Sequence, residues 1–197
     1  MYDEIKEKTI SMKTCYDIFS AINKRQIEAL MFHDQMADYF GFLAYAGYKE
    51  MHEYQYISES LEHRKTKKYF MKKHNRILKD EVTNPKAVPV EWFSRERNEA
   101  TDSVKVKGVR DGMMAYHAWE KETLELYEKC ASLAMKMGKI CDYEYITCLI
   151  KDTSDEIERI EKIVLDLISV DYDVVYILEA QDCLHKMYKD KLNEIFD

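Results

Sequence analysis

The sequence has few residues that form turns or end helices, since it contains only 5 glycines and 2 prolines among 197 residues. Collagen needs glycine at every third position, and disordered chains are usually rich in glycine and proline, so the composition argues against both classes. Apolar residues make up 46% of the chain, which is enough for a hydrophobic core in one domain of this length. The scarcity of turn residues predicts a helical protein.

The pattern of cysteines argues against two kinds of small stabilised scaffold. The number of cysteines is odd and no CxxC pair occurs, so neither a zinc knuckle nor a complete disulfide framework is indicated. We expect reduced and mainly buried thiols, as in a protein of a reducing compartment. The five cysteines are Cys15, Cys130, Cys141, Cys148 and Cys183.

Long apolar segments are missing as well. No run approaches the roughly 20 apolar residues that a membrane-spanning helix needs. The first ten residues, MYDEIKEKTI, are charged from the third position and lack the apolar stretch of a signal peptide. We therefore expect a cytoplasmic protein without a membrane partner.

The net charge and the missing motifs narrow the function classes. The chain has 30 Lys and Arg against 37 Asp and Glu, a formal charge of −7, which argues against a surface that binds nucleic acid or anionic membranes throughout. The patterns GxGxxG, GxSxG, HExxH and the Walker loop do not occur. Nucleotide binding by such loops, serine-hydrolase chemistry and zinc proteolysis therefore lack support.

Apolar residues recur at three- and four-residue steps in several segments, as in helices that bury one face. Both prolines fall within residues 84–108, the only long stretch without clear periodicity, which predicts a long crossover between two helical hairpins. The predicted long helices cover residues 22–44, ending near Gly47, then 49–80, 113–138 and 143–170, with a fifth helix at 173–195 and a short separate helix at 3–20.

Two segments carry a resemblance to a known superfamily. HDQMADYFGFLAYAGY (33–48) is similar to the aromatic-rich first helix of ferritins, and LYEKCASLAMKMGKICDYEY (126–145) is similar to their hairpin between the third and fourth helices. Together with the order of helices, these segments make residues 22–195 resemble the ferritin-like superfamily. The resemblance implies an all-α fold, in which residues 1–197 form a single ferritin-like four-helix bundle with a long crossover and an additional C-terminal helix.

Four polar residues, one on each long predicted helix, fall at similar heights in such a bundle. His33 and His63 lie at nearly equal distances along the chain from the turn between their helices, and so do Glu120 and Glu156. His33 and Glu120 occupy positions of the apolar stripe. Because buried ionisable groups need partners or a metal, we expect this layer to be functional or internally paired.

The resemblance implies a metal centre in this layer, built from inward-facing carboxylates and imidazoles. Members typically carry ExxH, or a carboxylate-only variant, on the second and fourth helices. Here these segments read ESLEH (59–63) and DTSDE (152–156). If His63 and Glu156 are placed at the last position of this motif, its first carboxylate is missing from both helices. We therefore expect a shifted or partial site. The candidate metal ligands are His33, Glu59, Glu62, His63, His117, Glu120, Asp152, Asp155 and Glu156.

Two functions from different classes stay open at this point. In the first, the resemblance implies a di-iron or di-manganese centre for an oxidation linked to O2 or peroxide. In the second, the same polar residues form a satisfied network without a metal, and the protein acts in binding or assembly. The residues alone do not decide whether the protein is an enzyme.

A basic segment bears on the second function. Residues 64–79 hold eight Lys and Arg and no acidic residue, whereas residues 142–197 hold 15 acidic and 6 basic residues. These charges favour pairing of the two regions, within the chain or between the subunits of a homodimer. The alternative is an acidic partner that docks on residues 64–79. Nucleic acid is disfavoured as a partner because Tyr69 and Phe70 are too few to form a stacking platform.

Overall fold

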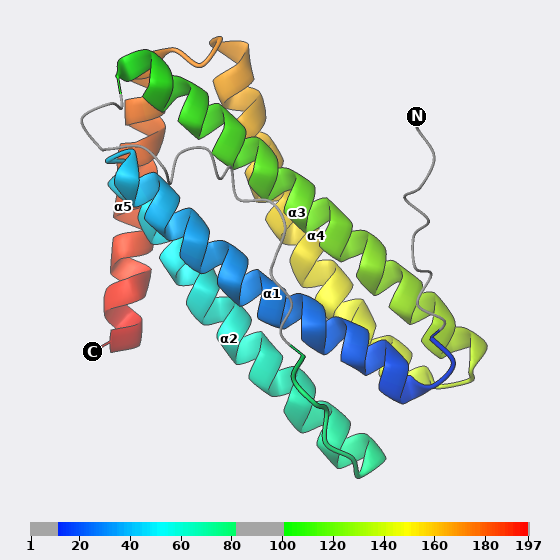
Figure 1. The fold of residues 1–197 in the computed structure, drawn as a ribbon. Coiled ribbons are helices and arrows are strands. Elements are labelled where there is room, and N and C mark those ends of the chain that lie inside the picture. Colours follow the sequence, from blue (N-terminus) through cyan, green and yellow to red (C-terminus); the bar gives the residue numbers. More distant parts are fainter. Residues whose placement is uncertain (1–11, 82–100, 197) are drawn as a thin grey trace, which may run out of the picture.

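The computed structural model describes residues 12–81 and 101–196, and within these ranges the chain forms five helices and no strand (Figure 1). The crossover predicted within residues 84–108 lies mostly outside the described residues, as does the beginning of the short helix predicted at 3–20. The helices are α1 (Cys15–Phe42), α2 (Ala46–His74), α3 (Asp102–Lys136), α4 (Ile140–Ser169) and α5 (Val174–Phe196).

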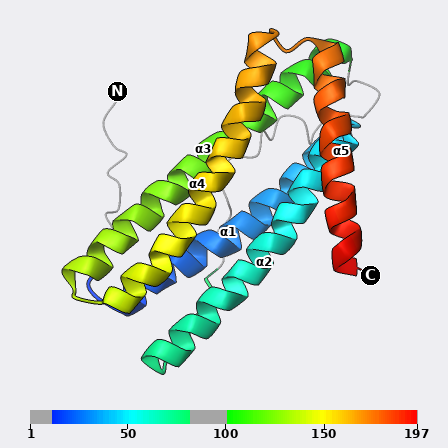
Figure 2. The same ribbon diagram turned by 180° about the vertical axis from the view of Figure 1, so that it is seen from behind.

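The helices are arranged as two antiparallel hairpins and one additional helix. Figures 1 and 2 show α1 beside α2 and α3 beside α4, each pair joined by a tight turn. The α1 helix also contacts α3, which joins the hairpins, and α5 packs on α2 near the turn between α1 and α2. None of the helices in the described ranges is both long enough and apolar enough to cross a membrane.

The start of α1 corrects the prediction of a separate helix at residues 3–20. Thr14 caps α1, because its hydroxyl accepts a hydrogen bond from the Asp17 amide (3.2 Å) while the Asp17 carboxylate accepts one from the Thr14 amide (2.8 Å). This reciprocal capping box fixes a helix start. From Cys15 the helix then runs without a break to Phe42, so residues 15–20 belong to the first long helix.

Two other helix boundaries differ from the sequence prediction. The α2 helix ends at His74 rather than at Asp80, because Asn75 takes a left-handed conformation (φ 49°) that stops it. The α3 helix begins at Asp102, so residues 102–108, predicted as crossover, are helical. Gly108 lets α3 approach α1 closely, since a Cβ there would lie 2.5 Å from Leu43 Cδ1. Because glycine has no apolar side chain, residue 108 does not continue the apolar spacing from which the rest of the helix was predicted.

The hydrophobic core consists of two clusters separated by polar side chains. One cluster is centred on Phe32, Tyr116 and Trp119, and the other on Phe19 and Phe70. Between them lie buried or half-buried polar residues from the middle of the helices. The polar residues of this layer include Gln26, His33, His52, Glu120 and Glu156. Three of the four residues predicted for one layer, His33, Glu120 and Glu156, lie in this region, but His33 lies beside His52 rather than at the height of His63.

Candidate metal centre

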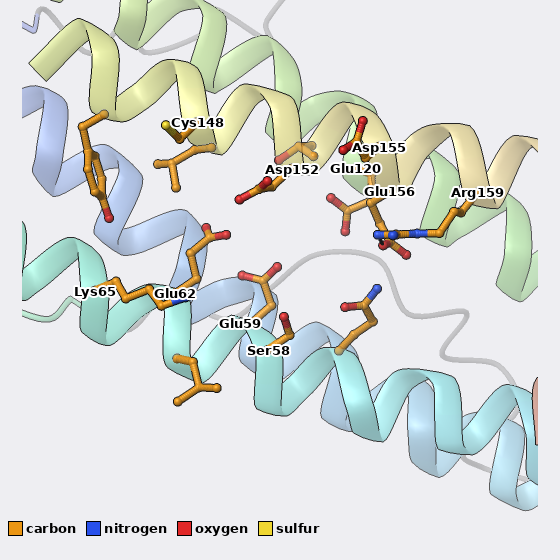
Figure 3. A pocket seen from close by; sticks show the side chains of 15 residues that line it. Ser58, Glu59, Glu62, Lys65, Glu120, Cys148, Asp152, Asp155, Glu156 and Arg159 are labelled. Carbon is orange, nitrogen blue, oxygen red and sulfur yellow. Dashed lines mark hydrogen bonds and ion pairs between the residues drawn. The ribbon is translucent and has the colours of Figure 1, made fainter. Parts of the chain in front are cut away.

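A cleft of about 390 Å³ opens between α2 and α4 at the level of the polar layer (Figure 3). It exists because α2 packs mainly on α1 and α5, while α4 packs mainly on α3. The two helices thus face each other across open space along this part of the bundle. Lys65 lies at one end of the cleft and Arg159 at the other.

Carboxylates from three helices line the cleft. On α2 two glutamates are three residues apart, and on α4 three acidic residues follow at steps of three and one, so each set projects from one side of its helix. In Figure 3 the side chains of α2 point across the cleft toward those of α3 and α4. The six acidic residues are Glu59 and Glu62 from α2, Glu120 from α3, and Asp152, Asp155 and Glu156 from α4.

Hydrogen bonds position two of these carboxylates. Glu156 accepts a hydrogen bond from the buried Tyr116 hydroxyl at 2.6 Å and also pairs with the Arg159 guanidinium. Glu62 accepts a hydrogen bond from the Gln26 side-chain amide at 2.7 Å. These contacts fix the two carboxylates from opposite walls of the cleft.

The remaining negative charge of the cleft is poorly compensated. Burial raises the pKa of Glu59 well above its usual range, and nearby carboxylates, with Glu62 first among them, raise it further. Burial also raises the pKa of Glu62, although the hydrogen bond from Gln26 opposes this shift. The positive charge of Arg25 acts in the opposite direction and lowers the pKa of Glu59, but it is the smallest of these influences. The Arg25 guanidinium stacks 3.4 Å from the Trp119 ring centre and is held there.

A buried histidine pair adjoins Glu120. His33 Nε2 lies 3.8 Å from a Glu120 oxygen, and His33 Nδ1 lies 2.9 Å from His52 Nδ1. Burial, together with the neighbouring His33, holds the pKa of His52 well below its usual range, so His52 is neutral. His52 Nε2 has no hydrogen-bond partner among the described residues.

The sequence prediction did not include His52. Its spacing to Gln55, Glu59 and Glu62 follows the inward face of α2, with steps of three and four residues. That periodicity is the signal that could have identified it.

The structure brings seven of the nine predicted ligands to this region, six in the cleft and His33 beside Glu120. The other two make contacts elsewhere. His63 Nε2 lies 2.9 Å from Asn23 Oδ1 and 3.6 Å from Asp80, and His117 Nε2 lies 2.9 Å from a Glu161 oxygen. Neither imidazole is among the residues that line the cleft.

The motif on α2 is displaced by one residue from the register assumed in the sequence analysis. Glu59 and Glu62 line the cleft, whereas Ser60 and His63 do not. In this register α2 carries an ExxE pattern, which is the carboxylate-only variant, and its first carboxylate is present. The expectation that this carboxylate is missing from α2 followed from placing His63 in the layer.

Known structures share this arrangement of helices. An open-pore ferritin from the hyperthermophilic archaeon Archaeoglobus fulgidus matches with a TM-score of 0.71 at 17% sequence identity, covering 89% of this chain and 98% of the ferritin. An engineered closed form of the same ferritin matches with a TM-score of 0.71 at 16% identity, over 87% and 94% of the two chains. A humanized archaeal ferritin gives 0.70 at 14% identity, over 87% and 95%.

No family model matches the sequence, and no curated protein matches it. At identities below 20% the structural matches establish the fold alone. The protein is a ferritin-like helical bundle, which confirms the fold class expected from its sequence.

Proposed function

We propose that the cleft between α2 and α4 binds iron or manganese as a dinuclear carboxylate centre and that the protein carries out an oxidation linked to O2 or peroxide. The observation that carries this proposal is the set of carboxylates that three helices direct into one cleft. Burial, together with repulsion from neighbouring carboxylates, raises the pKa of Glu59 and Glu62, so added positive charge would favour their ionised forms. A pair of divalent cations would supply that charge.

The donor set fits such ions. Iron and manganese in the divalent state accept carboxylate oxygens and imidazole nitrogens, and two ions in one site need several oxygens that can bridge them. Glu59, Glu62 and Glu120 are the ligands we favour, because no Lys or Arg side chain pairs with them among the described residues. When bound, the metals would supply the electrons that reduce the oxidant.

The surrounding residues have distinct roles in this proposal. Asp152 and Asp155 are exposed on the α4 side of the cleft, where their charge attracts cations from solvent. Tyr116 and Arg159 hold Glu156 in place, so this carboxylate must leave Arg159 to become a ligand. His52, through its contact with His33, orients the imidazole that adjoins Glu120.

The test is the metal content of untagged protein after anaerobic incubation with Fe(II) or Mn(II), measured by mass spectrometry. We expect about two equivalents per chain and at least a tenfold loss of bound metal in the double variant Glu59→Gln/Glu62→Gln. The matched control is Glu125→Gln/Glu158→Gln, which makes the same change in charge at exposed positions outside the cleft. Less than a tenth of an equivalent in the wild type, or equal loss in both variants, would overturn the proposal.

One observation favours a second function, binding or assembly without a metal. The basic residues of α2 are largely exposed, and Lys67 pairs with Asp80 of the following segment rather than with the acidic C-terminal region. Beside them Met71 and Ile77 are 50% and 76% exposed. This face would suit an acidic partner or a second subunit. Charge reversal by Lys68→Glu/Lys72→Glu should then change the sedimentation coefficient of a self-associating protein or abolish capture of an acidic partner. A sedimentation profile equal to that of the wild type would exclude self-association through this face.

A further inference from the structure

A second group of ligand-type side chains lies at the opposite end of the α1–α2 hairpin from α5, outside the cleft. Cys15 is the first residue of α1, His74 is the last residue of α2, and Asp142 is in the first turn of α4. One sulfur, one ring nitrogen and one carboxylate oxygen from these residues all lie within 4.8 Å of one another. Three helix ends from both hairpins thus meet at one point.

Asp142 is the centre of this group, and one of its oxygens has no partner. The residue is only 2% exposed. Its Oδ1 accepts a hydrogen bond from the Tyr69 hydroxyl at 2.8 Å and lies 3.0 Å from His74 Nε2. Its Oδ2 is buried and has no hydrogen-bond partner among the described residues. A buried, unpaired carboxylate oxygen is costly, so it indicates a missing cation or donor.

The other two side chains are held in position by the fold. The His74 ring stacks on Phe70, with ring centres 4.6 Å apart, and also contacts Phe19. Cys15 follows the Thr14 capping box directly, so its backbone is fixed at the start of α1.

We propose that Cys15, His74 and Asp142 bind one zinc ion through Sγ, Nε2 and a carboxylate oxygen. A thiolate, an imidazole and a carboxylate are the ligand types of zinc sites, and a water molecule would complete a tetrahedron. Tetrahedral bonds of zinc place neighbouring ligand atoms roughly 3.3 to 3.8 Å apart, so the observed group needs only side-chain rotations to close around the ion. Two negative ligands and one neutral ligand balance its charge.

The composition of this site separates it from the cleft. The carboxylates of the cleft suit hard ions, whereas a thiolate selects softer ones such as zinc. A hollow of about 350 Å³ beside His74 and Asp142 leaves room for the water ligand, and it is lined in part by Lys73 and Lys139. Because the three ligands come from α1, α2 and α4, the ion would tie the ends of the two hairpins together.

Cobalt(II) is the probe for this site, since thiolate ligation produces an intense near-ultraviolet charge-transfer absorption. We expect the wild type to bind one equivalent with this absorption, zinc to abolish it by displacement, and Cys15→Ser to remove it and weaken zinc binding at least tenfold. Asp142→Asn, which keeps an acceptor for Tyr69, should weaken zinc binding by a similar factor. The absence of the absorption from the wild type would overturn the proposal.

Two control variants make the assignment specific. Cys141→Ser removes an exposed thiol next to Asp142, and Cys148→Ser removes the thiol that lines the cleft. Both should keep the absorption, and its survival in Cys15→Ser with loss in either control would assign the thiolate elsewhere and refute the site. Circular dichroism confirms that each variant is folded. Glu59→Gln/Glu62→Gln should leave the absorption unchanged, so failure of the cleft proposal is seen separately.

Discussion

Adding one methyl group at Gly47 should strongly destabilise the folded protein. Gly47 lies in the first turn of α2, directly against α5. A Cβ on Gly47 would lie 2.0 Å from the backbone oxygen of Gln181 and 2.8 Å from the backbone nitrogen of His185. Non-bonded carbon and oxygen atoms need a separation of roughly 3.4 Å or more. Because backbone atoms cannot rotate away as a side chain can, Gly47→Ala must push α5 outward by about 1 Å or more.

The cost follows from what α5 buries. Leu184 and Tyr188 are only 6% and 5% exposed, and both pack in the core cluster on this side of the bundle. Overpacking a tight contact costs about 1–3 kcal/mol, and full loss of two such side chains from the core would cost about 3–6 kcal/mol. We therefore expect Gly47→Ala to lower the free energy of unfolding by about 2–5 kcal/mol.

Gly41, near the end of α1, provides the matched control. A Cβ there would lie 3.4 Å from Lys49 Cδ, on a flexible side chain that can move. Gly41→Ala should therefore stabilise the protein by about 0.5–1 kcal/mol through helix propensity. Urea denaturation followed by circular dichroism compares both variants with the wild type. A Gly47→Ala variant within about 0.5 kcal/mol of the wild type would refute the close approach of α2 and α5.

Three further predictions test the cleft, the core and the thiols. Because burial raises the pKa of Glu59 in the folded state, its contribution to stability is full below the unfolded pKa and is lost as pH rises through the folded value. Without added metal, the melting temperature of Glu59→Gln minus that of the wild type should therefore be larger at pH 8 than at pH 5. An equal difference at both pH values would contradict this. Phe32 is fully buried, so Phe32→Ala should cost about 3–5 kcal/mol in urea denaturation, and a loss below 1 kcal/mol would contradict its place in the core. Burial raises the pKa of Cys130 to about 12, so a thiol reagent should label it only on unfolding, while rapid labelling of the native protein would show that it is accessible. The cysteines expected to react rapidly are Cys141, Cys148 and Cys183, whose exposure shows that the expectation of mainly buried thiols was wrong.

The sequence predicted the helices better than it predicted their ends. Apolar periodicity identified each long helix because a helix that buries one face must repeat apolar residues every three or four positions. It failed at residues 102–108, where Gly108 takes the place of a stripe residue, and at residues 75–80, where a left-handed Asn75 ends α2. It also split α1, whose start depends on a capping box at Thr14.

For the candidate site, the sequence predicted the layer but not the register. The sequence placed His63 at the height of His33, but His33 lies beside His52 and His63 lies beside Asn23. Glu62 lines the cleft whereas the next residue, His63, does not, because consecutive residues of a helix point in different directions. The proposed zinc site was even less predictable from the sequence. No spacing pattern links Cys15, His74 and Asp142, because each comes from the end of a different helix.

The amino-acid sequence alone determined the helical class, the two hairpins, the fifth helix and the presence of polar residues at mid-bundle. These properties are local, since they depend on turn residues and on periodicity within one segment. The tertiary structure alone decided that α2 and α4 stand apart to leave a cleft, that Glu62 rather than His63 enters it, and that three helix ends meet at Asp142. These properties depend on the rotation and spacing of packed helices, which are fixed by contacts between residues far apart in the chain.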